Sequence, residues 1–313
     1  MRVLVTGAAG FIGSNLAARL LADGYEVVGL DDLSDGTEEN LERAEGIRFV
    51  EGDLRDRDAV AAAAAGCEVI FHQGAKRSVP RSIVEPELFT DVNVRGTLNV
   101  LLSARDESAR VVSASSSSVY GDQERFPLVE TMYPSPRSPY AASKLAGEAY
   151  CRAFRLSLDV WTVSLRYFNV YGPGQDPASE YAAVVPRFIV ACLTGQPPVI
   201  HGDGEQARDF TYIDDVIDAN ILAAQAPPEA QGLTFNVGGG AEPTSVNEVL
   251  RIVAELTGSS PQPVFEPPRP GDVRYTEADV SFAHRLLGYT PSVKMREGLE
   301  RTVEHFRSAV PRG

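Results

Sequence analysis

A tyrosine and a lysine stand four residues apart in the stretch SPYAASK, which runs from Ser138 to Lys144. On a helix this spacing places Tyr140 and Lys144 on one face, and Ser138 followed by Pro139 is typical of a helix start. A tyrosine, with an ordinary pKa of about 10, is a poor base at neutral pH, but a nearby ammonium group stabilises the phenolate and lowers that pKa. The pair therefore predicts an acid–base centre. The plain alternative is an exposed tyrosine and a solvated lysine, which any helix can carry.

Three glycines in the stretch VTGAAGFIG, Gly7, Gly10 and Gly13, directly follow a β-branched run and precede an amphipathic one. Glycine there lets the backbone approach a pyrophosphate at the positive end of a helix, so the turn is typical of dinucleotide binding. Asp31 ends the next β-branched run, where a carboxylate can accept hydrogen bonds from both ribose hydroxyls of an adenosine. The same carboxylate repels a 2′-phosphate and no arginine is adjacent, so NAD is favoured over NADP. A merely glycine-rich turn is the alternative.

These residues need a scaffold that brings turns and helix starts to one edge. The first half of the chain alternates short β-branched runs with helical segments, among them a long helix around 93–105. Apolar strands separated by helices argue for a parallel sheet covered on both faces, and we predict a doubly wound α/β fold of the Rossmann type. After about residue 170, Pro and Gly punctuate shorter elements, which indicates a smaller C-terminal α/β region with helices near 213–226, 245–257 and 295–309.

The composition is that of a globular protein of 313 residues, with 43% hydrophobic and 23% charged residues. A net charge of −14 argues against nucleic-acid binding, and it means that cations for a phosphate ligand must be clustered locally. No apolar run reaches the roughly 20 residues of a membrane span, and the N-terminus is typical of a strand and turn rather than a signal peptide. Three cysteines without a CxxC pair predict reduced thiols in a cytoplasmic protein, and no metal site is predicted.

The glycine turn, Asp31, a run of serines after a fifth strand and the YxxxK pair occur in an order that resembles the extended short-chain dehydrogenase/reductases. The resemblance covers essentially the whole chain and sharpens toward the nucleotide-sugar 4-epimerases, those of UDP-glucose and especially of UDP-N-acetylglucosamine. Five stretches carry it: HQGAKRSVPRS (72–82), RYFNVYGPGQDP (166–177), YAAVVPRF (181–188), HGDGEQARDFTYIDDV (201–216) and RPGDVRYTEAD (269–279). It implies an NAD-binding domain over 1–168, to which 211–237 returns, and a UDP-sugar-binding region over 169–313.

By this resemblance, Tyr140 takes the proton of the sugar O4 while a hydride leaves C4 for NAD, and Lys144 holds the cofactor ribose. The 4-keto sugar then turns over and receives the hydride on its other face, so NAD is regenerated in each turnover and is expected to stay tightly bound. The resemblance implies the following NAD-binding residues: Gly7, Gly10, Phe11, Ile12, Gly13, Asp31, Asp32, Asp53, Leu54, Gly74, Ala75, Lys76, Tyr140, Lys144 and Tyr167.

Four consecutive serines, Ser115 to Ser118, lie within the stretch SASSSSVYG. Counted back from VYG, the family's catalytic serine or threonine falls on Ser116, and Ser117 is predicted as a further catalytic residue beside it. The related 4,6-dehydratases carry an Asp–Glu pair at positions 117 and 118, and the decarboxylases carry a Glu at the second, because elimination needs an additional acid and base. A hydroxyl is too weak a base to take a proton from carbon, so the two serines disfavour dehydration. Hydrogen bonding at a strand end is the alternative role, favoured for Ser115.

The resemblance also implies a set of residues for the UDP-sugar. Arg208 in GEQARDF and Arg269 in PRPGD match arginines that bind the diphosphate, for which a planar guanidinium is suited. Asp272 matches a contact to the uridine ribose, and Asn169 matches a residue that positions the diphosphate and hexose. A surface salt bridge is the alternative role of any one charged residue. The predicted substrate-binding residues are Arg77, Ser116, Ser118, Asn169, Val185, Arg208, Arg269, Asp272 and Thr276.

Several positions bear on which sugar is accepted. UDP-glucuronate epimerases carry a threonine at the position of Asn169 and an arginine at that of Asp176, so these two residues speak against a uronic acid. The family's gate residue falls on Thr276, whose small side chain leaves room for a 2-acetamido group and predicts that UDP-GlcNAc and UDP-GalNAc are accepted. Lys76 and Arg77 stand where N-acetyl-specialised relatives have an uncharged pair. They are expected near the cofactor phosphates, and they weaken the case for an acetylated sugar.

Two other functions stay open on the sequence alone. A sugar-nucleotide dehydratase or 4-ketoreductase would share the scaffold, and a non-enzymatic NAD(H)-sensing regulator would share the cofactor site. The missing carboxylates at 117–118 count against the dehydratase, and the intact Tyr140–Lys144 pair counts against the regulator. The resemblance further implies a homodimer formed through the helices near 92–106 and 138–156.

Overall fold

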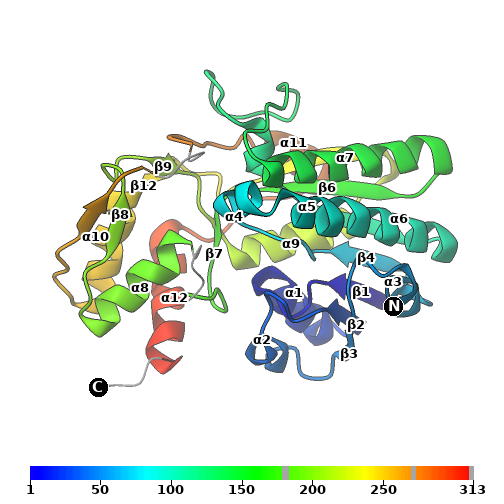
Figure 1. Cartoon of the computed structure of the whole chain (residues 1–313), viewed down its shortest axis with the longest axis horizontal. Helices are drawn as coiled ribbons and strands as arrows, with labels where there is room; N and C mark the ends of the chain where they lie inside the picture. The colour runs from blue at the N-terminus through cyan, green and yellow to red at the C-terminus, as the bar shows by residue number, and fades with distance from the viewer. Residues whose placement is uncertain (178–182, 269–272, 310–313) are drawn as a thin grey trace.

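The computed structural model describes residues 1–177, 183–268 and 273–309. Its centre is a seven-stranded parallel sheet in the order β11-β6-β5-β4-β1-β2-β3 (Figure 1). The strands are β1 (Arg2–Thr6), β2 (Glu26–Asp31), β3 (Arg48–Glu51), β4 (Val69–His72), β5 (Arg110–Ser116), β6 (Thr162–Tyr167) and β11 (Leu233–Val237). The predicted doubly wound α/β class is confirmed.

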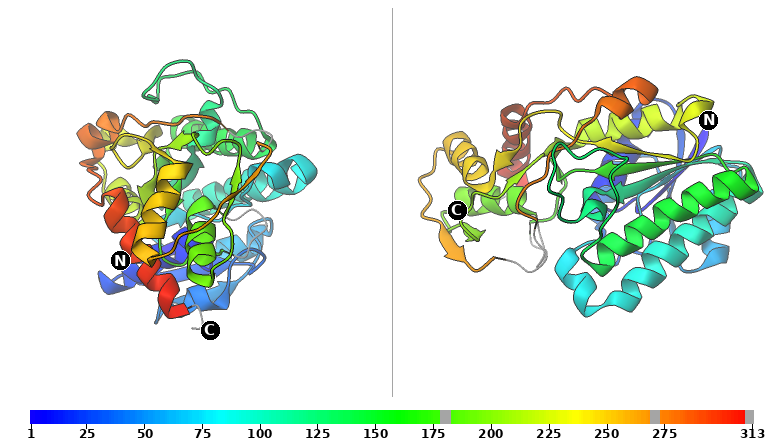
Figure 2. Two further views of the ribbon diagram at one scale, coloured as in Figure 1. Left: turned by 90° about the vertical axis from the view of Figure 1, so that its left-hand side faces the viewer. Right: turned by 90° about the horizontal axis from the view of Figure 1, so that it is seen from above.

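Helices cover both faces of this sheet, because successive residues of a strand point to opposite sides. In β1, Val3 and Val5 belong to the hydrophobic core on one face, and Leu4 belongs to the core on the other. The right-hand view of Figure 2 shows the strands between these two helical layers. The first layer holds α1 (Phe11–Ala22), α9 (Ile213–Ala224) and α11 (Ser281–Leu287), and the second holds α3 (Arg57–Ala64), α6 (Gly96–Glu107) and α7 (Pro139–Leu158).

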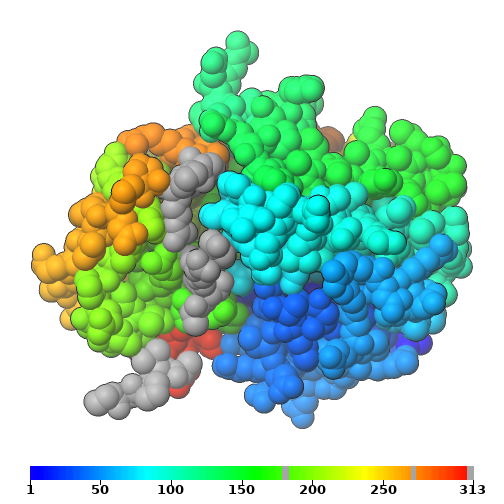
Figure 3. Space-filling model, in the orientation of Figure 1, coloured from blue at the N-terminus to red at the C-terminus, as the bar shows by residue number. Residues whose placement is uncertain are grey.

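The C-terminal part is built on shorter elements and lies against the N-terminal part, as the space-filling view shows (Figure 3). Its helices are α8 (Val184–Thr194), α10 (Val246–Thr257) and α12 (Met295–Ala309). Together with α9, which covers the central sheet, α10 and α12 are the three helices predicted after residue 210. Its strand pairs are β7 (Val170–Tyr171) with β10 (Thr211–Tyr212), β9 (Ala207–Arg208) with β12 (Thr244–Ser245), and β8 (Val199–His201) with β13 (Val264–Glu266).

The connecting segments contain short helical elements. They are α2 (Glu38–Glu42), α4 (Val79–Val84), α5 (Pro86–Phe89), the π-helical turn η1 (Thr90–Arg95), and the 3-10 turns η2 (Ser117–Tyr120) and η3 (Pro228–Ala230). The single long helix predicted around 93–105 therefore begins as the π-helical turn η1 before it continues as α6. Among the helices of the described residues, none is both long and apolar enough to cross a bilayer.

The order of the strands creates a crevice at the carboxyl edge of the sheet. The chain runs from β1 outward to β2 and β3, and it later places β4 on the opposite side of β1. Loops that follow β1 and β4 therefore diverge, and in open α/β sheets ligands bind at such a switch point. The glycine turn follows β1, and the serine run ends β5 at the same edge.

A buried ion pair fixes α7 against the sheet. The guanidinium of Arg166 on β6 donates from Nη2 to Glu148 Oε2 at 2.7 Å and from Nε to Glu148 Oε1 at 2.9 Å. The two side chains are only 4% and 7% exposed. Ser115 on β5 donates a further hydrogen bond to Glu148, and the guanidinium lies 4.5 Å from the centre of the Tyr120 ring. One helix and two strands are thus joined through a single carboxylate.

We predict that Glu148→Ala lowers the free energy of unfolding by about 3–5 kcal/mol, because it leaves a guanidinium buried without its counter-charge. Urea-induced unfolding followed by circular dichroism measures the change. Glu255→Ala is the matched control, since Glu255 on α10 also pairs with two arginines, Arg251 and Arg296, but at exposed positions. Exposed pairs contribute little, so this variant should unfold as the wild type does. Equal effects of the two substitutions would contradict the role given to the buried pair.

Candidate active site

A cavity of about 500 Å³ opens at the carboxyl edge of the sheet. It is lined by every predicted site residue that the structure describes except Val185, which lines a neighbouring cavity of about 230 Å³. Arg269 and Asp272 lie outside the described residues. The fold thus brings together residues from the loops after β1, β2, β3, β4, β5 and β6 and from the start of α7, while their individual roles stay predictions.

The glycine turn is shaped by two close approaches of backbone to backbone. Gly7 has a φ of +68°, and a Cβ on it would lie 2.7 Å from the Cα of Gly74 in the loop after β4. A Cβ on Gly13 would lie 2.0 Å from the carbonyl oxygen of Gly7. The helix α1 that follows has no side-chain cap and no acidic residue in its first turn. Its first N–H groups, positive and uncapped at the cavity wall, suit the pyrophosphate of a dinucleotide.

Two carboxylates, those of Asp31 and Asp53, line the same cavity as the glycine turn. Asp31 is 9% exposed, and its two oxygens accept hydrogen bonds from the backbone N–H groups of Ala9 at 3.0 Å and Leu33 at 2.9 Å. Burial raises the pKa of Asp31, although these two hydrogen bonds oppose the change. Asp53 forms an ion pair with Arg55, which lowers the pKa of Asp53. Fixed acceptors at this place fit the ribose hydroxyls of an adenosine, so the residues present fit NAD.

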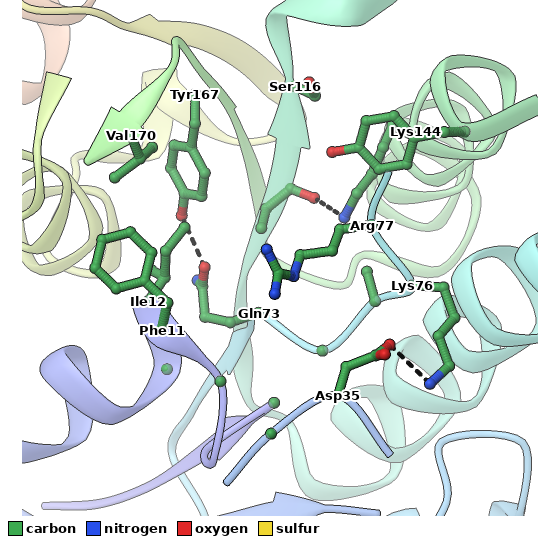
Figure 4. Close-up of a pocket in the computed structure, with 18 of the residues that line it drawn as sticks. Phe11, Ile12, Asp35, Gln73, Lys76, Arg77, Ser116, Lys144, Tyr167 and Val170 are labelled. Carbon is green, nitrogen blue, oxygen red and sulfur yellow. Dashed lines mark hydrogen bonds and ion pairs between the residues drawn. The ribbon is translucent and has the colours of Figure 1, made fainter. Parts of the chain in front are cut away.

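The helix start that was predicted for the acid–base pair is present. Ser138 caps α7 by accepting from Ala141 N at 3.1 Å, and Pro139 is the first helical residue. Lys144 donates from Nζ to the carbonyl oxygen of Ala114 on β5 at 2.9 Å (Figure 4). Tyr140 is half-buried and lines the same cavity as Ser116. The two predicted partners therefore lie beside the serine run.

Burial shifts both groups of the pair toward their neutral forms. It raises the pKa of Tyr140, against the hydrogen bond from Ser116 and the charge of Arg77. It lowers the pKa of Lys144 to about 8, against the charge of Glu148. Loss of water outweighs Ser116 and Arg77, and the ammonium of Lys144 is directed to the carbonyl oxygen of Ala114, so the lowering of the Tyr140 pKa by this ammonium stays a prediction.

The four serines divide between two tasks. Ser115 donates to the buried Glu148, the strand-end hydrogen bonding expected of it. Ser116 Oγ accepts from the hydroxyl of Ser118 at 2.9 Å and from Ser118 N at 3.2 Å. Ser117 begins the turn η2 and lines the cavity. The hydroxyls of Ser116 and Ser118 are therefore linked at the wall of the cavity that Tyr140 also lines.

Several polar residues of the site were missed in the sequence. Asn93, in the π-helical turn, accepts from Lys76 N at 2.7 Å and donates to Lys76 O at 3.0 Å and to Ser143 Oγ at 2.9 Å. It thereby ties the loop after β4 to α7, within one turn of Tyr140 and Lys144. The available signal was an asparagine flanked by valines in a predicted helix, where a polar side chain has to find a buried partner.

Gln73 and Tyr167 form a second polar group on the opposite wall. The Tyr167 hydroxyl donates to Gln73 Oε1 at 3.1 Å, as the close-up shows (Figure 4), and Asn220 on α9 bonds to both side chains. Arg77 extends into the cavity between Gln73 and Lys144 in the same view. The cavity therefore has an ordered group of neutral side chains at Gln73, Tyr167 and Asn220, and the cation of Arg77 extends beside it.

Two of the predicted substrate residues, Asn169 and Arg208, lie where the two cavities adjoin. Asn169, Val170 and Arg208 line both, so the cavities share a wall. Asn169 donates from Nδ2 to the carbonyl oxygen of Asp209 at 2.9 Å and to Thr276 Oγ1 at 3.2 Å. Thr276, 8% exposed, is thereby held at the rim. The arrangement suits an elongated ligand with an anionic middle.

Comparison with known proteins agrees with this geometry. Residues 3–238 match the family described as NAD dependent epimerase/dehydratase. A UDP-glucose 4-epimerase of Mycolicibacterium smegmatis is 46% identical over 314 residues, which cover 98% of this chain and 99% of that protein. The crystal structure of a Thermotoga maritima UDP-glucose 4-epimerase with UDP-glucose has a TM-score of 0.94 at 38% identity, with 99% of each chain covered. A UDP-N-acetylglucosamine 4-epimerase of Methanobrevibacter ruminantium, in complex with UDP-N-acetylmuramic acid, has a TM-score of 0.93 at 37% identity, again over 99% of each chain. The resemblance to nucleotide-sugar 4-epimerases is confirmed, and the chain belongs to the NAD dependent epimerase/dehydratase family.

Proposed function

We propose that the protein is an NAD-dependent nucleotide-sugar 4-epimerase that inverts C4 of a UDP-hexose or a UDP-N-acetylhexosamine. The observation that carries the proposal is the placement of Tyr140, Ser116 and Lys144 in one cavity, between a glycine turn fit for a dinucleotide and an adjoining cavity. Cofactor binding is assigned to 1–168 with 211–237, since β11 joins the sheet and α9 covers it, and substrate binding to 169–313.

The residues around the glycine turn would hold the cofactor. The N–H groups at the start of α1 would bind the pyrophosphate, Asp31 the adenosine ribose, and Lys144 the other ribose. When bound, NAD supplies the acceptor for the C4 hydride and then its donor, so it is not consumed. Tyr167 and Gln73, fixed by Asn220, would form a rigid wall beside it.

Tyr140 would move the proton of the substrate's O4 hydroxyl through its own Oη. Burial disfavours the phenolate, so the groups that lower the pKa of Tyr140 are those that make it a base: the Ser116 hydrogen bond and the charge of Arg77. Ser116 would share the same proton, and Ser118 would orient the Ser116 hydroxyl. Ser117 and Ser118 carry no carboxylate, so nothing at this place supports elimination.

The wall shared by the two cavities would bind the nucleotide diphosphate. Arg208 is the cation on that wall, and its fork suits phosphate oxygens. Asn169 would contact the diphosphate and hexose, and Arg269 and Asp272, outside the described residues, would complete the site. The smaller cavity is lined by apolar side chains, Val185 among them, together with polar ones such as Gln206, a mixture that suits the flat face and polar edge of a uracil base.

The rim of the cavity supports acceptance of both acetylated and plain hexoses. Thr276 is small, and its hydroxyl is engaged by Asn169, so it leaves space at the rim for a 2-acetamido group. Of the two bases that weakened this inference, Lys76 is ion-paired with Asp35, and Arg77 projects into the cavity (Figure 4). Asp176 lines the cavity as well, and its negative charge disfavours a uronic acid.

A homodimer in the cytoplasm completes the proposal. The helices α6 and α7 pack side by side on one face of the sheet, and α7 exposes 74% of Leu156 and 37% of Tyr150. Apolar side chains on a paired helical surface are suited to a second copy of the chain. The three cysteines are buried free thiols, which accords with a reducing compartment.

Purified protein incubated with UDP-GlcNAc or UDP-Glc, without added cofactor, should form the 4-epimer and reach a stable equilibrium. The physical reason is that the hydride returns to the carbon it left, so the reaction needs only the NAD already bound. Proton NMR distinguishes the epimers. A 4-keto-6-deoxy product, or no conversion of any UDP-sugar, would contradict the proposed function.

Tyr140→Phe should lower turnover by about 10²–10⁴-fold, because it removes the group that carries the O4 proton. The NAD released on denaturation should be unchanged, since the ring stays in place. Tyr133→Phe, at a position that is 86% exposed and lines neither cavity, is the control and should leave turnover as in the wild type. Substantial activity of Tyr140→Phe would show that another group is the base.

Thr276→Tyr should narrow the rim and exclude the acetamido group. The ratio of kcat/KM for UDP-GlcNAc to that for UDP-Glc should fall at least about tenfold, which corresponds to about 1.4 kcal/mol. The substitution also breaks the hydrogen bond between Asn169 and Thr276. A loss of activity that this causes equally for both substrates cancels in the ratio. Thr276→Ser is the control and should keep the ratio, whereas an unchanged ratio in Thr276→Tyr would refute the assignment.

A further inference from the structure

An ion pair between a buried lysine and an exposed aspartate joins two loops at the wall of the cavity. Lys76, in the loop after β4, lies with Nζ 2.8 Å from Asp35 Oδ2 in the loop after β2 (Figure 4). Lys76 also donates to Ser34 Oγ, and Arg81 on α4 lies 3.0 Å from Asp35 Oδ1. Ser34, Asp35 and Lys76 all line the cavity.

The lysine is the fixed side of this contact. Lys76 is 6% exposed, and both its backbone N–H and its carbonyl are bonded to the Asn93 side chain. Asn93 is in turn bonded to Ser143 on α7. The position of the ammonium group is therefore set by the helix that carries Tyr140 and Lys144.

The loop after β2 is the segment that Lys76 holds in place. It leaves the sheet at Asp31, which takes up the N–H of Leu33, and it is bonded again where Thr37 N donates to Ala9 O at 3.1 Å. Between these points Ser34 and Asp35 are exposed residues that reach across to Lys76. The pair thus tethers the middle of a loop whose ends are already fixed.

Charge explains why this pair is firmer than a surface salt bridge. An ammonium group that is almost fully removed from water needs a counter-charge, so separating Lys76 from Asp35 is costly. Burial acts to raise the pKa of Asp35, but the hydrogen bonds and charges of Lys76 and Arg81 outweigh it and lower that pKa. The charge of Lys76 also favours the ionised forms of Asp31 and Asp53 nearby.

We infer that the Asp35–Lys76 pair is a latch that retains the bound cofactor, by preventing the loop after β2 from separating from the loop after β4 at the adenosine end of the cleft. The inference rests on the proposed function, in which Asp31 holds the adenosine ribose of NAD. Asp35 and Lys76 act as positioning residues that hold the walls, a role different from the direct NAD contact that the family resemblance implies for Lys76, and they take no part in hydride or proton transfer. Retention matters because an epimerase regenerates its cofactor in each turnover.

The test is the rate at which NAD leaves the protein in the absence of any sugar. Wild type, Asp35→Asn, Lys76→Met and the double variant are loaded with NAD and passed into cofactor-free buffer, and the NAD released with time is assayed. Each single variant should release NAD at least about tenfold faster than the wild type. The double variant should be no faster than the faster single one, because both substitutions open the same latch.

Asp23→Asn is the matched control, since Asp23 forms an exposed ion pair with Arg19 on α1, and its release rate should equal that of the wild type. Circular dichroism melting of the cofactor-free proteins shows whether each variant is folded, and Asp35→Asn, at an exposed position, keeps the test available if Lys76→Met does not fold.

Fast release from Lys76→Met alone would mean that Lys76 touches the cofactor itself, and this overturns the latch. Unchanged release from both variants overturns it as well, with the proposed function intact. A folded wild type that takes up no NAD would refute the proposed function and the latch together.

Discussion

The position of α7 against the sheet depends on the buried pair between Glu148 and Arg166. That carboxylate lies one turn beyond Lys144 on the same helix, and it also accepts from Ser115, the residue before Ser116. A shift of the pair would therefore move the helix and the strand that carry the three reactive side chains. Buried charges must stay paired, so this contact holds the geometry of the site to one arrangement.

The burial that makes the site rigid also disfavours the charged forms of its side chains. Burial moves the pKa of Tyr140 up and that of Lys144 down, so each group is pushed toward its neutral form. The opposing groups are few and specific: Ser116 and Arg77 act on the tyrosine, and Glu148 acts on the lysine. Because the chain carries a net charge of −14, these local partners cannot be replaced by a general positive field.

The cofactor cleft illustrates how loops from distant parts of the sequence are joined. Gly7 packs against Gly74, Asn93 fixes the backbone of Lys76, and Lys76 pairs with Asp35, which is 41 residues earlier. Side chains that take no part in the reaction thus connect the glycine turn to the acid–base pair and hold both in place. In the proposed reaction, such order keeps a reusable cofactor in place while the sugar turns over.

The sequence by itself determined the doubly wound fold, the glycine turn, the cap of α7 and the one-faced spacing of Tyr140 and Lys144. Each follows from local propensity or from periodicity, which short stretches carry in full. Only the tertiary structure decided that Lys76 faces Asp35, that Asn93 in the π-helical turn links the loop after β4 to α7, and that the pKa of Tyr140 rises. These features depend on desolvation and on contacts between residues far apart in the chain, and both arise only when the chain folds.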